Sequence, residues 1–270
     1  MIKFDSVSFS YDDERQILDN INIAIEKGEW VAVIGSNGSG KSTFARLING
    51  LLLPTTGKVT VDDMATDDEK QLQKIRQKVA FVFQNPDNQL VASTVEDDVA
   101  FGPENLSVPP AEIAKRVEQA LKLTGLEKYA KTPVYDLSGG EKQRVAIAGA
   151  LAMASSYIVL DEPTSMLDPV LRRQVLQVLH QLHSEMGMGL IYITNVMEEV
   201  YLADRVIVLD KGAFIMQGTP SEVFAERERL LQIGLGIPSA QEICLRLFAL
   251  GLLERNDLYD IEEIAAQLCR

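Results

Sequence analysis

Cysteine, histidine and long apolar runs are scarce in this sequence, and each scarcity excludes a class of protein. Only two cysteines and two histidines occur among 270 residues. Cys244 and Cys269 lack the spacing of metal ligands, so we expect two free thiols in a reducing compartment. The longest weakly polar run, residues 145–160, is interrupted by glycine and serine. It falls short of the about 20 apolar residues of a spanning helix, so none is predicted.

Basic residues are also few, and their scarcity bears on the kind of partner. Lys and Arg number 26 against 39 Asp and Glu, which gives a net charge of −13. Proteins that bind nucleic acid through its phosphates usually need a basic surface, so we expect no nucleic-acid partner. From residue 2 the N-terminus alternates apolar and polar side chains, which predicts a strand and not a signal peptide.

The pattern along the chain predicts an α/β fold. Helical periodicity is seen at residues 111–123 and 141–154. Strands are predicted at residues 2–9, 21–25, 30–34, 58–61, 157–160, 190–193 and 205–209. Alternating strands and helices are typical of a parallel sheet covered by helices. We expect no strand after residue 218, and a helical appendage over 221–270.

Three helix starts are expected in that appendage. They lie at Ser221, at Ser239 with Glu242 three residues later, and at Asp260 with Glu263 three residues later. The last two match the capping box, in which a serine or aspartate caps the helix and the glutamate reaches back.

A glycine-rich stretch after the strand at 30–34 matches the phosphate-loop pattern G-x-x-x-x-G-K-[ST]. Its small residues let backbone N–H groups curve around phosphate oxygens, the lysine reaches the β and γ phosphates, and the hydroxyl after it can bind Mg²⁺. The alternative is a flexible turn, which would not explain the strand, lysine and hydroxyl together. The predicted nucleotide-binding residues are Gly35, Ser36, Asn37, Gly38, Ser39, Gly40, Lys41, Ser42 and Thr43.

Two carboxylates end the apolar strand Tyr-Ile-Val-Leu-Asp-Glu at 157–162. Successive strand side chains point to opposite faces, so Asp161 and Glu162 are expected to have different tasks. Asp161 suits the Mg²⁺ shell, and Glu162 suits polarising the water that attacks the γ phosphate. A merely charged strand end is the alternative.

The segment Leu-Ser-Gly-Gly-Glu at 137–141 predicts a second anion site. Ser138 and Glu141 have the spacing of a capping box, so Ser138 is expected to open a helix whose N-terminal N–H groups face an anion. A capped surface helix alone would not explain the pair Gly139 and Gly140.

Together these motifs resemble the ATP-binding cassette (ABC) ATPases over residues 1–218. The resemblance implies a P-loop NTPase cassette with an N-terminal β subdomain, a RecA-like parallel-sheet core and a helical signature subdomain at about 85–155. It implies an ABC nucleotide-binding domain at 1–220 and a C-terminal helical dimerisation domain at 221–270. It also implies a head-to-tail dimer that buries two ATP molecules, each between the phosphate loop of one subunit and the signature of the other. By position, Tyr11 resembles the adenine-stacking aromatic, Gln84 the glutamine that links Mg²⁺ and water to the membrane partner, Asp168 the aspartate that crosses the dimer, and Ser138, Gly139 and Gly140 the γ-phosphate contacts.

Asn195 departs from the family pattern, which usually has a histidine there. Asparagine can donate a hydrogen bond to a phosphate, but it carries no charge and relays no proton. We therefore expect ATP binding with slow hydrolysis; a neutral substitution is the alternative.

The segment 84–106 and the helical tail are similar to the ATPase subunits of energy-coupling factor (ECF) importers. That resemblance implies a second ATPase, identical or a paralogue, a transmembrane coupling protein and membrane substrate-binding subunits for vitamins or other micronutrients. It places the chain peripherally on the cytoplasmic face of the membrane. A soluble ATP-switched scaffold, such as an iron–sulfur assembly ATPase, is the other hypothesis.

Overall fold

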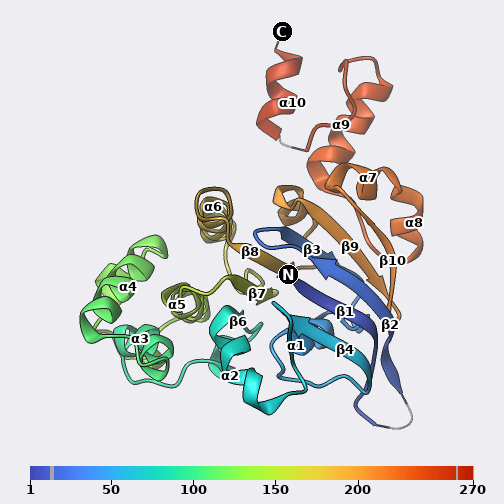
Figure 1. Cartoon of the computed structure of the whole chain (residues 1–270). Coiled ribbons are helices and arrows are strands. Elements are labelled where there is room, and N and C mark those ends of the chain that lie inside the picture. Colours follow the sequence, from blue (N-terminus) through green and yellow to red (C-terminus); the bar gives the residue numbers. More distant parts are fainter. Residues whose placement is uncertain (13–14, 260, 270) are drawn as a thin grey trace.

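A computed structural model describes residues 1–12, 15–259 and 261–269 of the chain. Two sheets occupy its middle, with one group of helices beside them and another beyond their end (Figure 1). The main sheet has six strands in the order β10-β9-β3-β8-β7-β6. Their bounds are β3 Trp30–Ile34, β6 Val79–Val82, β7 Tyr157–Asp161, β8 Gly189–Ile193, β9 Arg205–Asp210 and β10 Ala213–Gly218.

The five strands from β9 to β6 run parallel, and only β10 pairs antiparallel with its neighbour β9. Every residue of β3, β7 and β8 is buried, as expected for a parallel sheet covered on both faces. Side chains of β3 alternate between two cores: Trp30, Ala32 and Ile34 face one, and Val31 and Val33 face the other.

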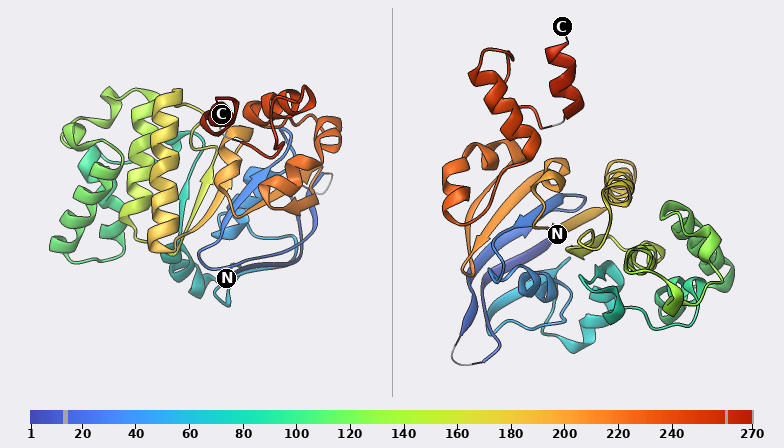
Figure 2. Two further views of the ribbon diagram at one scale, coloured as in Figure 1. Left: turned by 90° about the horizontal axis from the view of Figure 1, so that it is seen from above. Right: turned by 180° about the vertical axis from the view of Figure 1, so that it is seen from behind.

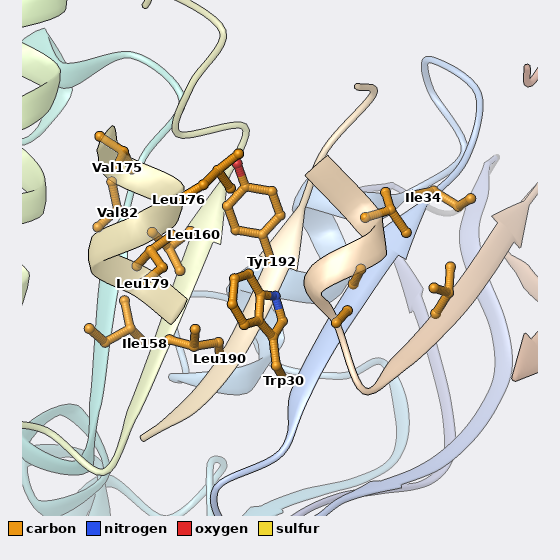
Figure 3. Packing of buried hydrophobic residues seen from close by; sticks show 14 of the residues in the cluster. Trp30, Ile34, Val82, Ile158, Leu160, Val175, Leu176, Leu179, Leu190 and Tyr192 are labelled. Carbon is orange, nitrogen blue, oxygen red and sulfur yellow. The ribbon is translucent and has the colours of Figure 1, made fainter. Parts of the chain in front are cut away.

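A helix covers each face of the main sheet. On one face α6 (Pro169–Met186) packs Val175, Leu176 and Leu179 against Trp30 and Tyr192 (Figure 3). On the other face α1 (Lys41–Ile48) shares a core with the N-terminal sheet, whose strand order is β2-β1-β4-β5. The strands of that antiparallel sheet are β1 Ile2–Ser10, β2 Gln16–Ile25, β4 Thr56–Val61 and β5 Met64–Ala65.

Three helices form a separate cluster beside the main sheet (Figures 1 and 2). They are α3 (Val95–Asn105), α4 (Pro110–Leu123) and α5 (Gly139–Ala152). Their apolar side chains, among them Val99, Leu121 and Val145, make a core of their own. Between the N-terminal sheet and this cluster, α2 (Glu69–Lys78) leads into β6.

Four helices follow β10 in the described part of the C-terminal segment, and Figure 2 shows the last two of them extending past the sheet. They are α7 (Pro220–Ala225), α8 (Arg227–Gln232), α9 (Ser239–Ala249) and α10 (Ile261–Leu268). Both thiols are free, with Cys244 buried in the small core of α9 and α10 and Cys269 exposed. Among the described residues, no helix is both long and apolar enough to cross a membrane.

The helix starts in this segment differ from the sequence predictions. Thr219 and not Ser221 caps α7, because Thr219 forms the capping box with Glu222. The expected box of Ser239 and Glu242 is absent, since α9 begins directly after Pro238 and the Ser239 hydroxyl bonds elsewhere. The third predicted cap, Asp260, lies outside the described residues.

A cationic cluster around Asp62 fastens the N-terminal sheet to the main sheet. Asp62 accepts hydrogen bonds from the terminal ammonium of Met1 at 2.6 Å, from Lys78 at 2.5 Å and from the Tyr157 hydroxyl at 3.2 Å. Burial alone would raise the pKa of Asp62, but the Lys78 ammonium and the terminal ammonium of Met1 hold it well below its ordinary range.

We predict that Asp62→Asn destabilises the fold in a pH-dependent way. A carboxylate with a lowered pKa stabilises the fold above the unfolded-state pKa and loses that contribution as the pH falls. Asp62→Asn should therefore cost about 1–3 kcal/mol of unfolding free energy at pH 7, and the deficit should shrink below about pH 4. Urea unfolding measures it, with the exposed neighbour Asp63→Asn as the matched control. Equal midpoints for the two variants at pH 7 would contradict the prediction.

Candidate nucleotide site

The phosphate-loop residues connect β3 to α1, so the loop ends at a helix N-terminus. Gly40 precedes the helix with a φ of 109°, a conformation that favours glycine. Gly35 has no room for a side chain, because a Cβ would lie 2.1 Å from the carbonyl oxygen of Leu209. The loop therefore presents backbone N–H groups at the positive end of α1, the geometry that binds phosphate.

Lys41 holds its ammonium against this loop. Its Nζ donates to the carbonyl oxygens of Gly35 at 2.8 Å and Ser36 at 3.0 Å, and the side chain is buried. Burial lowers the pKa of Lys41, while the charges of Glu162 and Asp161 act in the opposite direction. A buried cation beside a phosphate-binding loop suits a polyphosphate ligand.

Ser42 and Asp161 form a pair of oxygen donors at the start of α1. The Ser42 hydroxyl donates to Asp161 Oδ1 at 3.0 Å, and Asp161 is buried at the end of β7. Burial raises the pKa of Asp161, against the hydrogen bond from Ser42 and the charges of Arg46 and Lys41. A hydroxyl and a carboxylate are the hard oxygen ligands that Mg²⁺ prefers, so these residues fit that ion.

Glu162 lies between two amides that come from other parts of the chain. Gln84 Nε2 donates to one carboxylate oxygen at 2.7 Å, and Asn195 Nδ2 donates to the other at 2.5 Å. Asn195 Nδ2 also lies 3.2 Å from Asn37 Oδ1 of the phosphate loop. The structure thus brings Gln84, Asn195 and Glu162 together beside the loop. It directs Asp161 toward Ser42 and Glu162 toward the amides.

The environment of Glu162 suits a general base. Burial raises its pKa above the ordinary value, the positive charge of Lys41 opposes that shift, and the Asp161 carboxylate adds to it. A base with a raised pKa takes a proton more readily at neutral pH. Glu162 also has a φ of 48°, a left-handed conformation that costs about 1–3 kcal/mol in a residue with a side chain and is often found at functional sites.

Tyr11 lies at the edge of this site. Its hydroxyl is 3.2 Å from the Thr43 hydroxyl, and its ring meets Phe9 edge-on at 4.8 Å. The side chain is 57% exposed, so a flat aromatic surface is available near the loop for a base to stack on.

The signature residues lie apart from this cluster. Ser138 caps α5 and forms the predicted capping box with Glu141, and Gly140 lies beside Leu167. Asp168 caps α6 by accepting from the N–H groups of Val170 and Leu171. Among the described residues, the hydrogen bonds found for Ser138 and Asp168 stay within their own helix ends and do not reach the phosphate loop. The two predicted anion sites are therefore separate within one chain.

Sequence reasoning missed one buried charge near the site. Glu199 is 1% exposed and lies four residues after Asn195. The two glutamates of Met-Glu-Glu-Val match no motif, and only the position of Glu199 soon after a predicted strand could have drawn attention to it.

Comparison with known proteins finds relatives among ATP-binding cassette proteins. The family model described as ABC transporter matches residues 18–165. The chain is 52% identical, over all of its length and 99% of the relative, to the energy-coupling factor transporter ATP-binding protein EcfA1 of Caldanaerobacter subterraneus subsp. tengcongensis.

Two solved structures are similar in sequence and in shape. The structure of cbiO1 from Clostridium perfringens, described as part of the ABC transporter complex cbiONQ, has a TM-score of 0.75 and 40% identity, covering 86% of this chain and 94% of that one. A dimeric, post-hydrolysis structure of the ATP-binding cassette MJ0796 with ADP and Pi has a TM-score of 0.75 and 33% identity, covering 82% of this chain and 99% of that one.

We predict that Asn195→His accelerates ATP hydrolysis. An imidazole can carry charge and relay a proton where the amide can only donate a hydrogen bond, so turnover should rise about tenfold or more. The measurement is phosphate release from Mg-ATP by the assembled protein, with nucleotide affinity measured in parallel. Asn195→Gln, which keeps an amide, is the matched control and should not accelerate turnover. Unchanged turnover in Asn195→His would show that the asparagine does not limit the rate.

Proposed function

The chain belongs to the ABC transporter family, and we propose that it is the ATP-hydrolysing motor subunit of an ECF-type importer. The observation that carries this proposal is the cluster of Lys41, Ser42, Asp161 and Glu162 at one sheet edge. Its members supply a phosphate-binding loop, oxygen ligands and a base, which are the parts that phosphoryl transfer to water requires.

Within this proposal each group has a defined task. The N–H groups of the loop and Lys41 bind the triphosphate, and Tyr11 stacks on the adenine. Ser42, Asp161 and the side-chain oxygen of Gln84 would hold Mg²⁺, which supplies charge neutralisation when it is bound. Glu162 orients and deprotonates the attacking water, and Asn195 donates to the γ phosphate.

The proposed active unit contains two ATPases. The hydrogen bonds described for Ser138 and Asp168 do not reach the phosphate loop of their own chain. We infer that these two residues, with Gly139 and Gly140, contact a nucleotide held by a second cassette. The MJ0796 cassette, similar over 82% of this chain, is dimeric in its solved structure. We propose a head-to-tail pair with a paralogue or a second copy.

Hydrogen bonds join the segment after Gln84 to the signature helix α5. In the segment after Gln84, Gln89 Nε2 donates to the Ala146 carbonyl oxygen at 3.2 Å, and Lys142 Nζ pairs with Asp87 at 2.8 Å. A force on this segment would therefore move α5 as well. We propose that a membrane coupling protein docks here, so that closing of the ATPase pair shifts that protein.

The cargo is the part of the proposal that depends on other chains. The EcfA1 relative is named an energy-coupling factor transporter ATP-binding protein and matches this chain from end to end. By that likeness we propose uptake of a vitamin or another micronutrient, through separate membrane substrate-binding subunits, with this chain on the cytoplasmic face of the membrane. The alternative of a soluble scaffold is not favoured by relatives of this kind.

A substitution at Ser138 tests whether the nucleotide site is shared between two subunits. Ser138→Arg should abolish ATP hydrolysis, because a bulky cation would block the face that meets the other subunit's nucleotide, while nucleotide binding to the isolated chain is kept. Thr219→Arg is the matched control, since it removes the same kind of capping box from α7. Hydrolysis by Ser138→Arg at the rate of Thr219→Arg would remove the two-subunit site from consideration.

Isolation of the chain with its bound proteins tests the proposed partners. Purified from native membranes in mild detergent, the tagged chain should bring down a multi-span membrane protein and a cassette ATPase, identified by mass spectrometry. Small membrane proteins recovered with them would be the candidates for cargo binding. Recovery of soluble partners alone would overturn the importer proposal in favour of the scaffold.

A further inference from the structure

A buried carboxylate that the proposed chemistry does not use lies behind the hydrolysis site. Glu199 belongs to the 3-10 helix η4 (Met197–Leu202), and only 1% of it is exposed. Three hydroxyl groups donate to it: Thr164 at 2.5 Å to Oε1, and Tyr192 at 2.9 Å and Thr194 at 2.5 Å to Oε2. A carboxylate in such a place needs this many donors to offset the cost of losing water.

A cation completes the surroundings of Glu199. Arg172 Nε lies 3.4 Å from Glu199 Oε1. Arg172 is in the first turn of α6, which Asp168 caps. Glu199 thus contacts the loop after β7, the end of β8 and the start of α6.

Two of the hydroxyl donors, Thr164 and Thr194, are close in sequence to residues of the proposed hydrolysis site. Thr164 follows Glu162 by two residues, and the Ser165 hydroxyl donates back to the Glu162 carbonyl oxygen at 2.9 Å. Thr194 immediately precedes Asn195, and its hydroxyl oxygen accepts the N–H of Val196 at 3.0 Å.

The bond between the Thr194 hydroxyl and the Val196 N–H closes a short turn around Asn195. The O–H of Thr194 donates a hydrogen bond to Glu199, and its oxygen accepts one from the Val196 N–H. Without Glu199 to accept this hydrogen bond, the Thr194 hydroxyl could rotate, and the turn would lose the bond from the Val196 N–H. The position of the Asn195 amide, 2.5 Å from Glu162, depends on this chain of bonds.

We propose that Glu199 is a positioning residue for ATP hydrolysis, which fixes Glu162 and Asn195 relative to each other through Thr164 and Thr194. It touches neither nucleotide nor water in this proposal. Its effect on the rate comes from geometry, because a displacement of about 1 Å at a reacting group can cost about a hundredfold in rate. The inference rests on the role proposed above for Glu162.

The test is Glu199→Gln in the full chain with its partners. An amide has an NH₂ group where the carboxylate has a second acceptor, so at least one hydroxyl bond must reverse, and Arg172 loses the negative charge 3.4 Å from its Nε. We expect kcat to fall about ten- to hundredfold, while KM for ATP and nucleotide affinity stay within about threefold. Glu198→Gln is the matched control, since Glu198 is the adjacent carboxylate and bonds to Ser239 of the tail.

A second pair of variants keeps the inference testable if Glu199→Gln does not fold. Thr194→Ser keeps the hydroxyl and should keep kcat, whereas Thr194→Val has nearly the same shape without it and should lose kcat as Glu199→Gln does. A purely structural role would lower the thermal midpoint of both Thr194→Val and Glu199→Gln without changing the kcat of the folded protein.

The outcomes separate this inference from the proposed function. Two outcomes would overturn the positioning role. The first is a kcat within twofold of the unmodified protein in folded Glu199→Gln and Thr194→Val. The second is a loss of nucleotide affinity as large as the loss of kcat. Glu162→Gln provides the reference. If it still hydrolyses ATP normally, the proposed role of Glu162 fails, whereas an inactive Glu162→Gln beside an unaffected Glu199→Gln removes only the inference drawn here.

Discussion

The alignment of four parallel strands is the constraint on which the site depends. Ile193 at the end of β8 pairs with Val33 of β3 on one side and with Asp161 of β7 on the other. Val82 of β6 pairs with Leu160 of β7. Gln84 lies two residues after Val82, and Glu162 lies two residues after Leu160. Residues after parallel strands emerge at one sheet edge, where open α/β sheets bind their ligands. The phosphate loop, both carboxylates and Asn195 meet there for that reason.

A strongly acidic chain can bind a polyanion because the fields that decide binding are local. The net charge of −13 is spread over the surface, where charges are screened within about 8 Å at physiological salt. At the loop, Lys41 is buried and α1 directs its positive end outward. The carboxylates of Asp161 and Glu162 oppose the lowering of the pKa of Lys41 by burial, and a divalent cation, when bound, would offset their negative charge.

The sequence predicted the motifs well, because each consists of neighbouring residues with a fixed local geometry. The phosphate loop, the capped helix at Ser138 and the strand before Asp161 appear where they were expected. The short strands β5 and β6, the edge strand β10 and the helices α2 and α3 were not predicted, because their apolar patterns are short or mixed.

Contacts made by residues outside the recognised motifs could not be predicted from the sequence. The role of Glu199 depends on Thr164, Tyr192 and Arg172 converging on it, and spacing along the chain contains no sign of this. The caps of α7 and α9 were misplaced because proline at 220 and 238 decides where those helices start. A serine beside a proline is a weak guide to a cap when a threonine or an outside carboxylate competes for the same bonds.

Glu198 and Glu199 are adjacent, yet they serve different parts of the molecule: the first binds Ser239 at the start of the C-terminal helix α9, and the second binds the hydroxyls behind the nucleotide site. In a 3-10 helix successive side chains diverge by about 120°, so the two cannot exchange partners by side-chain rotation. Inserting one residue between Asn195 and Glu198 would place Glu198 where Glu199 now lies, and deleting one would place Val200 there. The length of this segment is thus more tightly constrained than its composition, and it should tolerate substitutions at its exposed positions far better than any change of register.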